Sequence, residues 1–100
     1  MKTLHLIEKL DKFRNVGQGL WESGDWDLTD AELAADAVAF HATKNEPSHF
    51  GGQIVSHRPS SDYAGRHVLV LRPTKDTVRG RPWGGSRTDS MAYKSLEDAE

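Results

Sequence analysis

The chain has 100 residues, of which 36% are hydrophobic, and a net charge of −2. This length is typical of one small domain and leaves little room for a large catalytic cavity, so we do not expect an elaborate enzyme. There is no cysteine, which excludes disulfides, thiolate nucleophiles and cysteine-based metal sites. We find neither a signal-peptide hydrophobic region nor a membrane-spanning run, and therefore expect a cytoplasmic protein without a membrane partner.

Charge is distributed unevenly along the sequence. Residues 1–57 carry five Lys/Arg against nine Asp/Glu, residues 58–94 carry eight against three, and residues 95–100 carry three acidic residues and no basic one. The basic part is suited to neutralising phosphates, whereas the acidic first half limits nonspecific attachment to nucleic acid. An ordinary mixed surface explains the same pattern equally well.

Two short helices are expected near the N-terminus. Apolar side chains at helical spacing predict an amphipathic helix that ends near residues 15–17. These side chains are Leu6, Ile7, Leu10 and Phe13. Residues 18–27 are rich in turn formers and predict a loop, or a short strand and turn. Thr29 and Glu32 match a capping box, which predicts a second helix from Asp30 to about Ala35.

The apolar pattern then changes to the period of strands. Val38 and Phe40 alternate with smaller or polar residues, and a second strand runs from Ile54 to His57. The run from His67 to Arg72 is the clearest strand, expected to be buried on both faces and bounded by Pro73. Residues 91–93 suit a last short strand.

These elements predict a single α+β domain over residues 1–94. The expected architecture is a small antiparallel sheet, curled or forming an open barrel, with two short N-terminal helices. Residues 95–100 are expected to form a mobile acidic tail.

The segment from Asp36 to Val55 resembles the PUA-like superfamily, in particular its EVE and ASCH domains. The resemblance is carried by the strand Asp36–His41, by Pro47 in the following polar loop, and by the return through Gly51–Val55. It implies nucleic-acid binding, with a modified or flipped base held in a pocket lined by aromatic side chains.

The polar loop and the basic arm that follows Lys75 supply the candidate binding groups. The loop provides hydrogen-bonding side chains, one cation and a glycine pair whose amides could lie open to a phosphate, although an ordinary turn would use the same residues. The expected nucleic-acid-binding residues are Thr43, Lys44, Asn45, Ser48, Gly51, Gly52, Gln53, Arg79, Arg81, Trp83 and Arg87. For Trp21 and Trp26 we favour a core position, and for Trp83 a stacking position.

Other readings of the same residues stay open. The ASCH resemblance implies an amidohydrolase alternative that would use Thr43, Lys44 and Glu46, but we expect no catalytic residue. The acidic first half could instead dock on a basic protein partner. His41, His49, His57 and His67 lack a metal-binding pattern, so we expect edge-strand or hydrogen-bonded histidines and neither a metal nor another cofactor.

Overall fold

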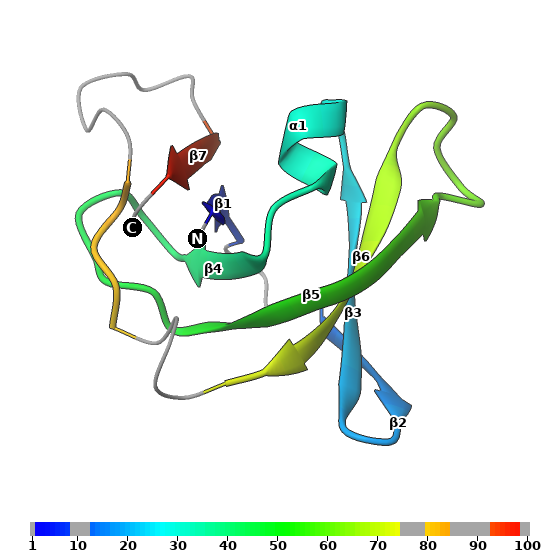
Figure 1. Ribbon diagram of the computed structural model, residues 1–100, viewed down its shortest axis with the longest axis horizontal. Helices are drawn as coiled ribbons and strands as arrows, with labels where there is room; N and C mark the ends of the chain where they lie inside the picture. Colours follow the sequence, from blue (N-terminus) through cyan, green and yellow to red (C-terminus); the bar gives the residue numbers. More distant parts are fainter. Residues whose placement is uncertain (1, 9–12, 75–79, 85–92, 99–100) are drawn as a thin grey trace.

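The computed structural model describes residues 2–8, 13–74, 80–84 and 93–98. Within these ranges the chain forms seven strands and one short helix (Figure 1). In chain order the elements are β1 (Lys2–Ile7), β2 (Phe13–Gly17), β3 (Leu20–Trp26), α1 (Asp30–Leu33), β4 (Ala37–His41), β5 (Phe50–Pro59), β6 (His67–Pro73) and β7 (Lys94–Asp98).

All seven strands belong to one mixed sheet with the order β2-β3-β6-β5-β4-β1-β7. β1 and β4 run parallel, while every other neighbouring pair is antiparallel. The sheet is strongly curled (Figure 1). As a result, the Phe13 ring on β2 lies 4.8 Å from that of Phe40 on β4 and 4.6 Å from that of Phe50 on β5, measured between ring centroids.

The main core fills the concave face of this curl. Its buried members come from β1, β3, β4 and β6 and from the segment around α1, so one cluster joins strands that are distant in the sheet order. They are Leu4, Leu6, Trp26, Leu28, Ala35, Val38, Phe40, Leu69 and Leu71. Trp21 packs against this cluster as well, so both N-terminal tryptophans lie where we expected them.

The predicted α+β class with two N-terminal helices is wrong, and so is the all-antiparallel sheet. The predicted first helix is absent: residues 2–7 form β1, buried from Thr3 to Leu6 and paired on both sides, and Phe13 begins β2. Helical spacing over so few residues is also met by apolar residues at the ends of two strands, and pairing between distant strands decided the outcome. Leu10 lies outside the described residues.

The segment 18–27, expected to be a loop or a short strand and turn, contains the end of a turn and the whole of β3. Gly24 allows β3 to approach β6 closely, because a Cβ there would lie 2.8 Å from Cγ2 of Val68. The turn before β3 uses Gly17, Gln18 and Gly19, all with positive φ.

The helix with the capping box is confirmed. Thr29 Oγ1 accepts a hydrogen bond from the Glu32 amide at 3.2 Å, and the Thr29 amide donates to Glu32 Oε1 at 2.8 Å. α1 ends at Leu33, two residues before the expected end. The strand over 67–72 is also confirmed, as β6, which ends at Pro73.

The C-terminal part differs from the prediction. β7 (Lys94–Asp98) contains residues 95–98 of the expected mobile acidic tail and pairs antiparallel with β1 from Lys2↔Asp98 to Leu6↔Lys94. Tyr93 precedes this strand. Residues 91 and 92 of the expected last strand lie outside the described residues.

β1 and β4 are buried on both faces of the sheet. The side chains that point to the main core are Leu4, Leu6, Val38 and Phe40. Those that point the other way are Thr3, His5, Ala37, Ala39 and His41, all buried. Residues 80–84, which we call the strap, cover this outer face, since a Cβ at Gly84 would lie 2.8 Å from the His5 ring.

Candidate functional site

An open cavity of about 310 Å³ lies where β1 and β3 end and β7 begins. Its lining residues are Ile7, Asp25, Trp26, Asp27, Arg66 and Tyr93. The Trp26 and Tyr93 rings are stacked, with centroids 6.3 Å apart and planes 18° apart. Trp26 is buried, but Tyr93 is 39% exposed. The cavity therefore combines an accessible aromatic face with one guanidinium and two carboxylates.

Hydrogen bonds fix the aromatic pair and the backbone beside it. Trp26 Nε1 donates to Ser23 Oγ at 2.9 Å. The Asp27 carbonyl oxygen accepts from Lys94 Nζ at 2.9 Å and from Tyr93 Oη at 3.4 Å. Lys94 also contacts Glu32 Oε1 at 2.8 Å. Burial raises the pKa of Glu32, but hydrogen bonds from Lys94 and Thr29 outweigh it and lower that pKa overall.

The carboxylates of Asp25 and Asp27 accept no hydrogen bond from any residue that the structure describes. Both residues line the cavity, and Asp25 also lines the second cavity described below. Arg66 is exposed, donates to the Asp25 carbonyl at 3.4 Å and lies over the Tyr63 ring. The same cavity thus offers hydrogen-bond acceptors from two carboxylates and donors from one guanidinium.

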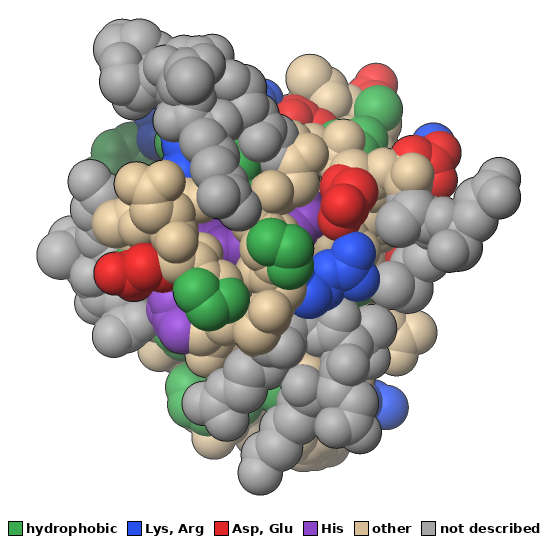
Figure 2. Space-filling view, turned by 90° about the vertical axis from the view of Figure 1, so that its left-hand side faces the viewer, with side chains coloured by type: hydrophobic (Ala, Val, Ile, Leu, Met, Phe, Trp, Pro, Cys, Tyr) green, Lys and Arg blue, Asp and Glu red, His purple; other side chains and the backbone are tan. Residues whose placement is uncertain are grey.

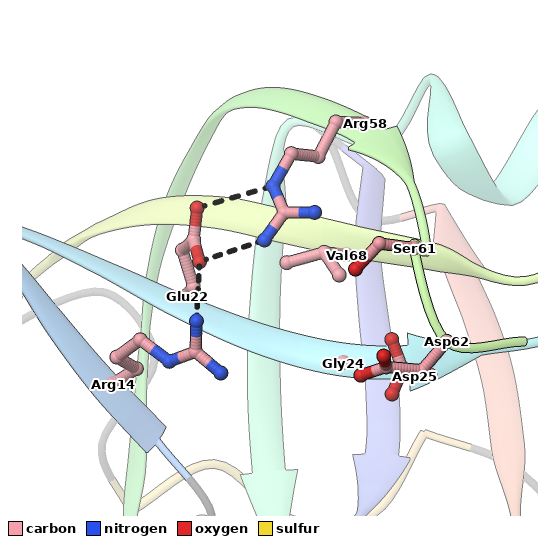
Figure 3. A pocket seen from close by; sticks show the side chains of 8 residues that line it. All are labelled: Arg14, Glu22, Gly24, Asp25, Arg58, Ser61, Asp62 and Val68. Atoms are coloured by element: carbon pink, nitrogen blue, oxygen red, sulfur yellow. Dashed lines mark hydrogen bonds and ion pairs between the residues drawn. The ribbon is translucent and has the colours of Figure 1, made fainter.

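A second cavity, of about 270 Å³, shares Asp25 with the first (Figure 3). Glu22 is held there by Arg58, whose Nη2 and Nε lie 3.1 Å and 3.3 Å from its two carboxylate oxygens. Arg14 Nη1 lies 3.9 Å from Glu22. Hydrogen bonds to Glu22 raise the pKa of Arg58. Because the Arg58 guanidinium is already paired with the Glu22 carboxylate, the charged groups of this cavity on β2, β3 and β5 mainly neutralise one another.

The predicted loop residues 43–48 are described, and they differ in exposure. Thr43 and Asn45 are exposed, and Thr43 Oγ1 accepts from the Asn45 amide at 3.3 Å. Lys44 Nζ is buried without a hydrogen-bond partner. Ser48 is buried and fastens the strap, because its hydroxyl oxygen accepts from the Arg81 amide at 2.9 Å and its carbonyl from the Gly80 amide at 2.8 Å.

The predicted glycine pair lies in the sheet and not in an open loop. Gly51 and Gly52 are buried in β5, where Gly52 is paired with Val38 on one side and Pro73 on the other. A Cβ at Gly52 would overlap the Arg72 carbonyl group. The glycine is therefore required for the approach of β6, and its amide is part of the sheet. Gln53 is exposed on the same strand.

The strap lies against the loop, so the structure brings together two of the predicted regions. Trp83 is only 5% exposed. Its ring packs edge-on against His5 and His41, with centroids 5.8 Å and 5.2 Å away, so no base can stack on it in this arrangement. Arg81 Nη2 donates to Glu97 Oε1 at 2.9 Å. The other two predicted residues, Arg79 and Arg87, lie outside the described residues.

Beneath the strap is a buried histidine network that sequence reasoning missed. His5 Nδ1 lies 2.9 Å from His41 Nε2, and His5 Nε2 lies 2.9 Å from Glu97 Oε1. His41 Nδ1 donates to the Glu46 carbonyl oxygen at 3.0 Å. His5 and His41 are both fully buried, with 0% of their surface exposed to solvent. Figure 2 shows the face of the molecule on the strap side, where acidic, basic and hydrophobic side chains are exposed.

Two of these groups have shifted pKa values. Burial lowers the pKa of His41, and the hydrogen bond to the Glu46 carbonyl only partly opposes this. The hydrogen bond from His5 lowers the pKa of Glu97, and Arg81 contributes in the same direction against the effect of burial. His41 is therefore held in its neutral form and Glu97 in its ionised form.

The structure also places the residues of the amidohydrolase and metal-site alternatives. Lys44 Nζ makes no hydrogen bond to Thr43 or Glu46, so the three amidohydrolase candidates are not linked. His41 contacts His5 and not His57, whose ring lies 5.8 Å from that of His67. In the described part of the chain, no group of three or more His, Cys, Asp or Glu side chains is placed to hold a metal ion.

Comparisons with family models, curated proteins and solved structures found no match to this chain. No helix among the described residues is long and apolar enough to cross a membrane. The PUA-like resemblance stays a prediction based on residues 36–55.

Proposed function

We propose that the protein binds single-stranded nucleic acid and holds one base against Tyr93 in the cavity formed with Trp26. The observation that carries this proposal is the stacked Trp26–Tyr93 pair beside Arg66, Asp25 and Asp27. Single-stranded nucleic acids are bound largely by stacking bases on aromatic side chains and arginine planes, while polar groups read the base edges.

The chemistry of the cavity suits a base. The Tyr93 ring is 39% exposed, is stacked with the Trp26 ring and has Lys94 Nζ over it at 5.9 Å from the ring centroid, so it is held in position with part of its surface open for stacking. Asp25 and Asp27 supply acceptors for an exocyclic amine, as in the pairing of a carboxylate with cytosine N4. Arg66 supplies donors for a base carbonyl or a flanking phosphate. We therefore expect a preference for bases that carry an exocyclic amine.

This proposal retains the function expected from the resemblance but places the base elsewhere. The exposed loop residues Thr43 and Asn45 remain candidate contacts to the nucleic-acid backbone. They lie in the loop between β4 and β5 and do not line the Tyr93 cavity. Their contribution is measured separately with Thr43→Ala and Asn45→Ala.

Binding is tested by fluorescence anisotropy with short labelled homopolymers of each base, as DNA and as RNA, at low and physiological salt. Tyr93→Leu removes the stacking face and should weaken binding about 5- to 150-fold, corresponding to roughly 1–3 kcal/mol. Tyr93→Phe is the matched control, because it keeps the ring and should retain binding. Equal affinities for the two variants would refute the base position.

A second pair of variants tests the cation. Arg66→Gln should weaken binding and reduce its salt dependence, because one phosphate or base contact is lost. Arg72→Gln changes another exposed arginine, on β6 away from the cavity, and should have little effect. Absence of binding by the wild-type protein at low salt would reject the nucleic-acid function itself.

The protein-interaction alternative is favoured by one specific observation, the two unbonded carboxylates in the same cavity. A cationic side chain of a basic partner would be attracted by Asp25 and Asp27 and by the face of Tyr93. A lysine- and arginine-rich peptide tests this reading. Tight binding of the peptide that is lost in Asp25→Asn and Asp27→Asn, without binding of oligonucleotides, would replace the nucleic-acid proposal.

A further inference from the structure

The strap, residues 80–84, is attached to the outer face of the sheet by a small number of identifiable contacts. Its amides at Gly80 and Arg81 donate to Ser48, and the Arg81 side chain donates to Glu97. Trp83 and Gly84 lie on the two imidazoles and on His5, respectively. The histidine pair is thus the surface on which the strap rests.

Counting protons in the network shows that it is charged. Three of its contacts each need a proton: His41 Nδ1 to the Glu46 carbonyl, His5 Nδ1 to His41 Nε2, and His5 Nε2 to the Glu97 carboxylate. Two neutral imidazoles carry only two protons. With Glu97 ionised, the pair must therefore hold one additional proton and a single positive charge.

We propose that the His5–His41 pair holds this additional proton as a pH-sensitive fastening that keeps the strap on the sheet. The proton lies on His5, because His5 is adjacent to the Glu97 carboxylate while burial and the surrounding charges favour neutral His41. The imidazolium joins β1 to β7 through Glu97 and, through the same carboxylate oxygen, to Arg81 of the strap.

The charged and titratable groups around His5 come from each neighbouring element. β4 contributes His41, β7 contributes Glu97, the strap contributes Arg81, and the 42–49 loop contributes His49, whose charge acts on His41. Glu97 is the carboxylate in contact with His5, and buried Glu8 lies next to His41, since its amide donates to the His41 carbonyl at 2.8 Å. Loss of the proton leaves Glu97 with Arg81 alone and removes the charge that joins β1, β7 and the strap.

The direction of the pH effect follows from Glu97. The hydrogen bond from His5 lowers the pKa of Glu97, so the stabilisation that the ionised carboxylate contributes is present above the ordinary carboxyl pKa. It is lost as the pH falls through the lowered pKa, because protonation removes the charge that joins β1, β7 and the strap. The strap should therefore loosen at acid pH.

The test uses nitrogen NMR of the histidine rings in the full chain. At about pH 6, both ring nitrogens of His5 should have protonated-type shifts, while His41 should be protonated only at Nδ1. The exposed His57 provides the reference titration. Two neutral rings in the pair at this pH would overturn the proposal, and this measurement needs no variant to fold.

Amide hydrogen exchange tests the consequence for the strap. Protection factors for the Gly80 and Arg81 amides, which donate to Ser48, should fall at least severalfold as the pH falls through the lowered pKa of Glu97. The Ile54 amide, which donates to the Asp36 carbonyl, is the control and should keep its protection. Protection of Gly80 and Arg81 that does not change through this pH range would also overturn the proposal.

Glu97→Gln provides an independent perturbation. Glutamine keeps the size and one acceptor but removes the negative charge, so the protection of the Gly80 and Arg81 amides should already be reduced at neutral pH and should no longer fall on acidification. Protection equal to that of the wild type would refute the role of Glu97. If the variant does not fold, Arg81→Gln, which leaves the His5–Glu97 pair intact, should lower the strap protection while the ring nitrogens of His5 keep their protonated-type shifts.

Discussion

Replacement of Gly52 by alanine distinguishes a packing role for this glycine from a ligand role. Gly52 lies in β5 between Val38 and Pro73, and a Cβ there would overlap the Arg72 carbonyl oxygen and lie 2.6 Å from its carbonyl carbon and 2.8 Å from Cα of Pro73. These are backbone atoms of a paired strand, so no side-chain rotation relieves the contact. The strands β5 and β6 must separate locally.

The cost can be worked out from the two consequences of that separation. Overpacking of a well-packed site costs about 1–3 kcal/mol, and the loss or distortion of one ladder hydrogen bond costs about 1 kcal/mol. We expect Gly52→Ala to lower the free energy of unfolding by about 2–4 kcal/mol, a large part of the roughly 5–15 kcal/mol typical of a domain.

The measurement is urea unfolding at neutral pH, followed by tryptophan fluorescence and circular dichroism. Gln53→Ala is the matched control, because Gln53 is exposed on the same strand and its loss should change the unfolding free energy by less than about 0.5 kcal/mol. If Gly52→Ala were as stable as the wild type and bound oligonucleotides less tightly, our reasoning would be refuted and the glycine would belong to a ligand site.

Three further predictions concern stability. Phe40→Ala should cost about 3–5 kcal/mol in urea unfolding, because this fully buried ring contacts three other aromatic rings; a cost under about 1 kcal/mol would contradict the core assignment. Thr29→Ala should cost about 1 kcal/mol through loss of the helix cap, and an unchanged thermal midpoint would contradict it. Glu97 has a lowered pKa, so its stabilisation is present above the ordinary carboxyl pKa and is lost as the pH falls through the lowered value; Glu97→Gln should therefore unfold with a flatter acid limb, and an identical limb would contradict the pairing.

Local signals were sufficient for the elements that depend on neighbouring residues. The capping box at Thr29 and Glu32 requires only a four-residue spacing, and α1 begins where it predicts. The run His67–Arg72 forms a strand because its side chains suit a strand wherever it pairs. Both were predicted from sequence, and both are present.

Elements that depend on distant partners were not predictable in this way. Residues 2–7 become a strand because β4 and β7 pair on either side of them, and β7 itself lies in a segment too polar to suggest burial. The alternation Thr3-Leu4-His5-Leu6 was the available sign of a two-sided strand. It was outweighed by the helical spacing of the residues that follow.

In the candidate site, too, the sequence indicated single residues but not the residues that the fold brings next to them. Trp26 was predicted to lie in the core, but Tyr93 and Arg66 join it in one cavity only through the curl of the sheet. Trp83 was expected to stack on a ligand because its sequence neighbours are polar, yet it is buried against histidines from two other strands. Sequence neighbours alone did not reveal that packing.

The pairing of β1 has a consequence for how the chain acquires its fold. β1 is hydrogen-bonded to residues 37–41 on one side and to residues 94–98 on the other, so its two partners are made long after it during synthesis. Contacts between such distant positions carry a large loop-closure entropy and are associated with slow folding. Until both partner strands have been synthesised, the apolar side chains of Leu4 and Leu6 cannot be buried between them. A nascent chain at this stage should therefore depend on chaperones more than a chain that folds into local hairpins.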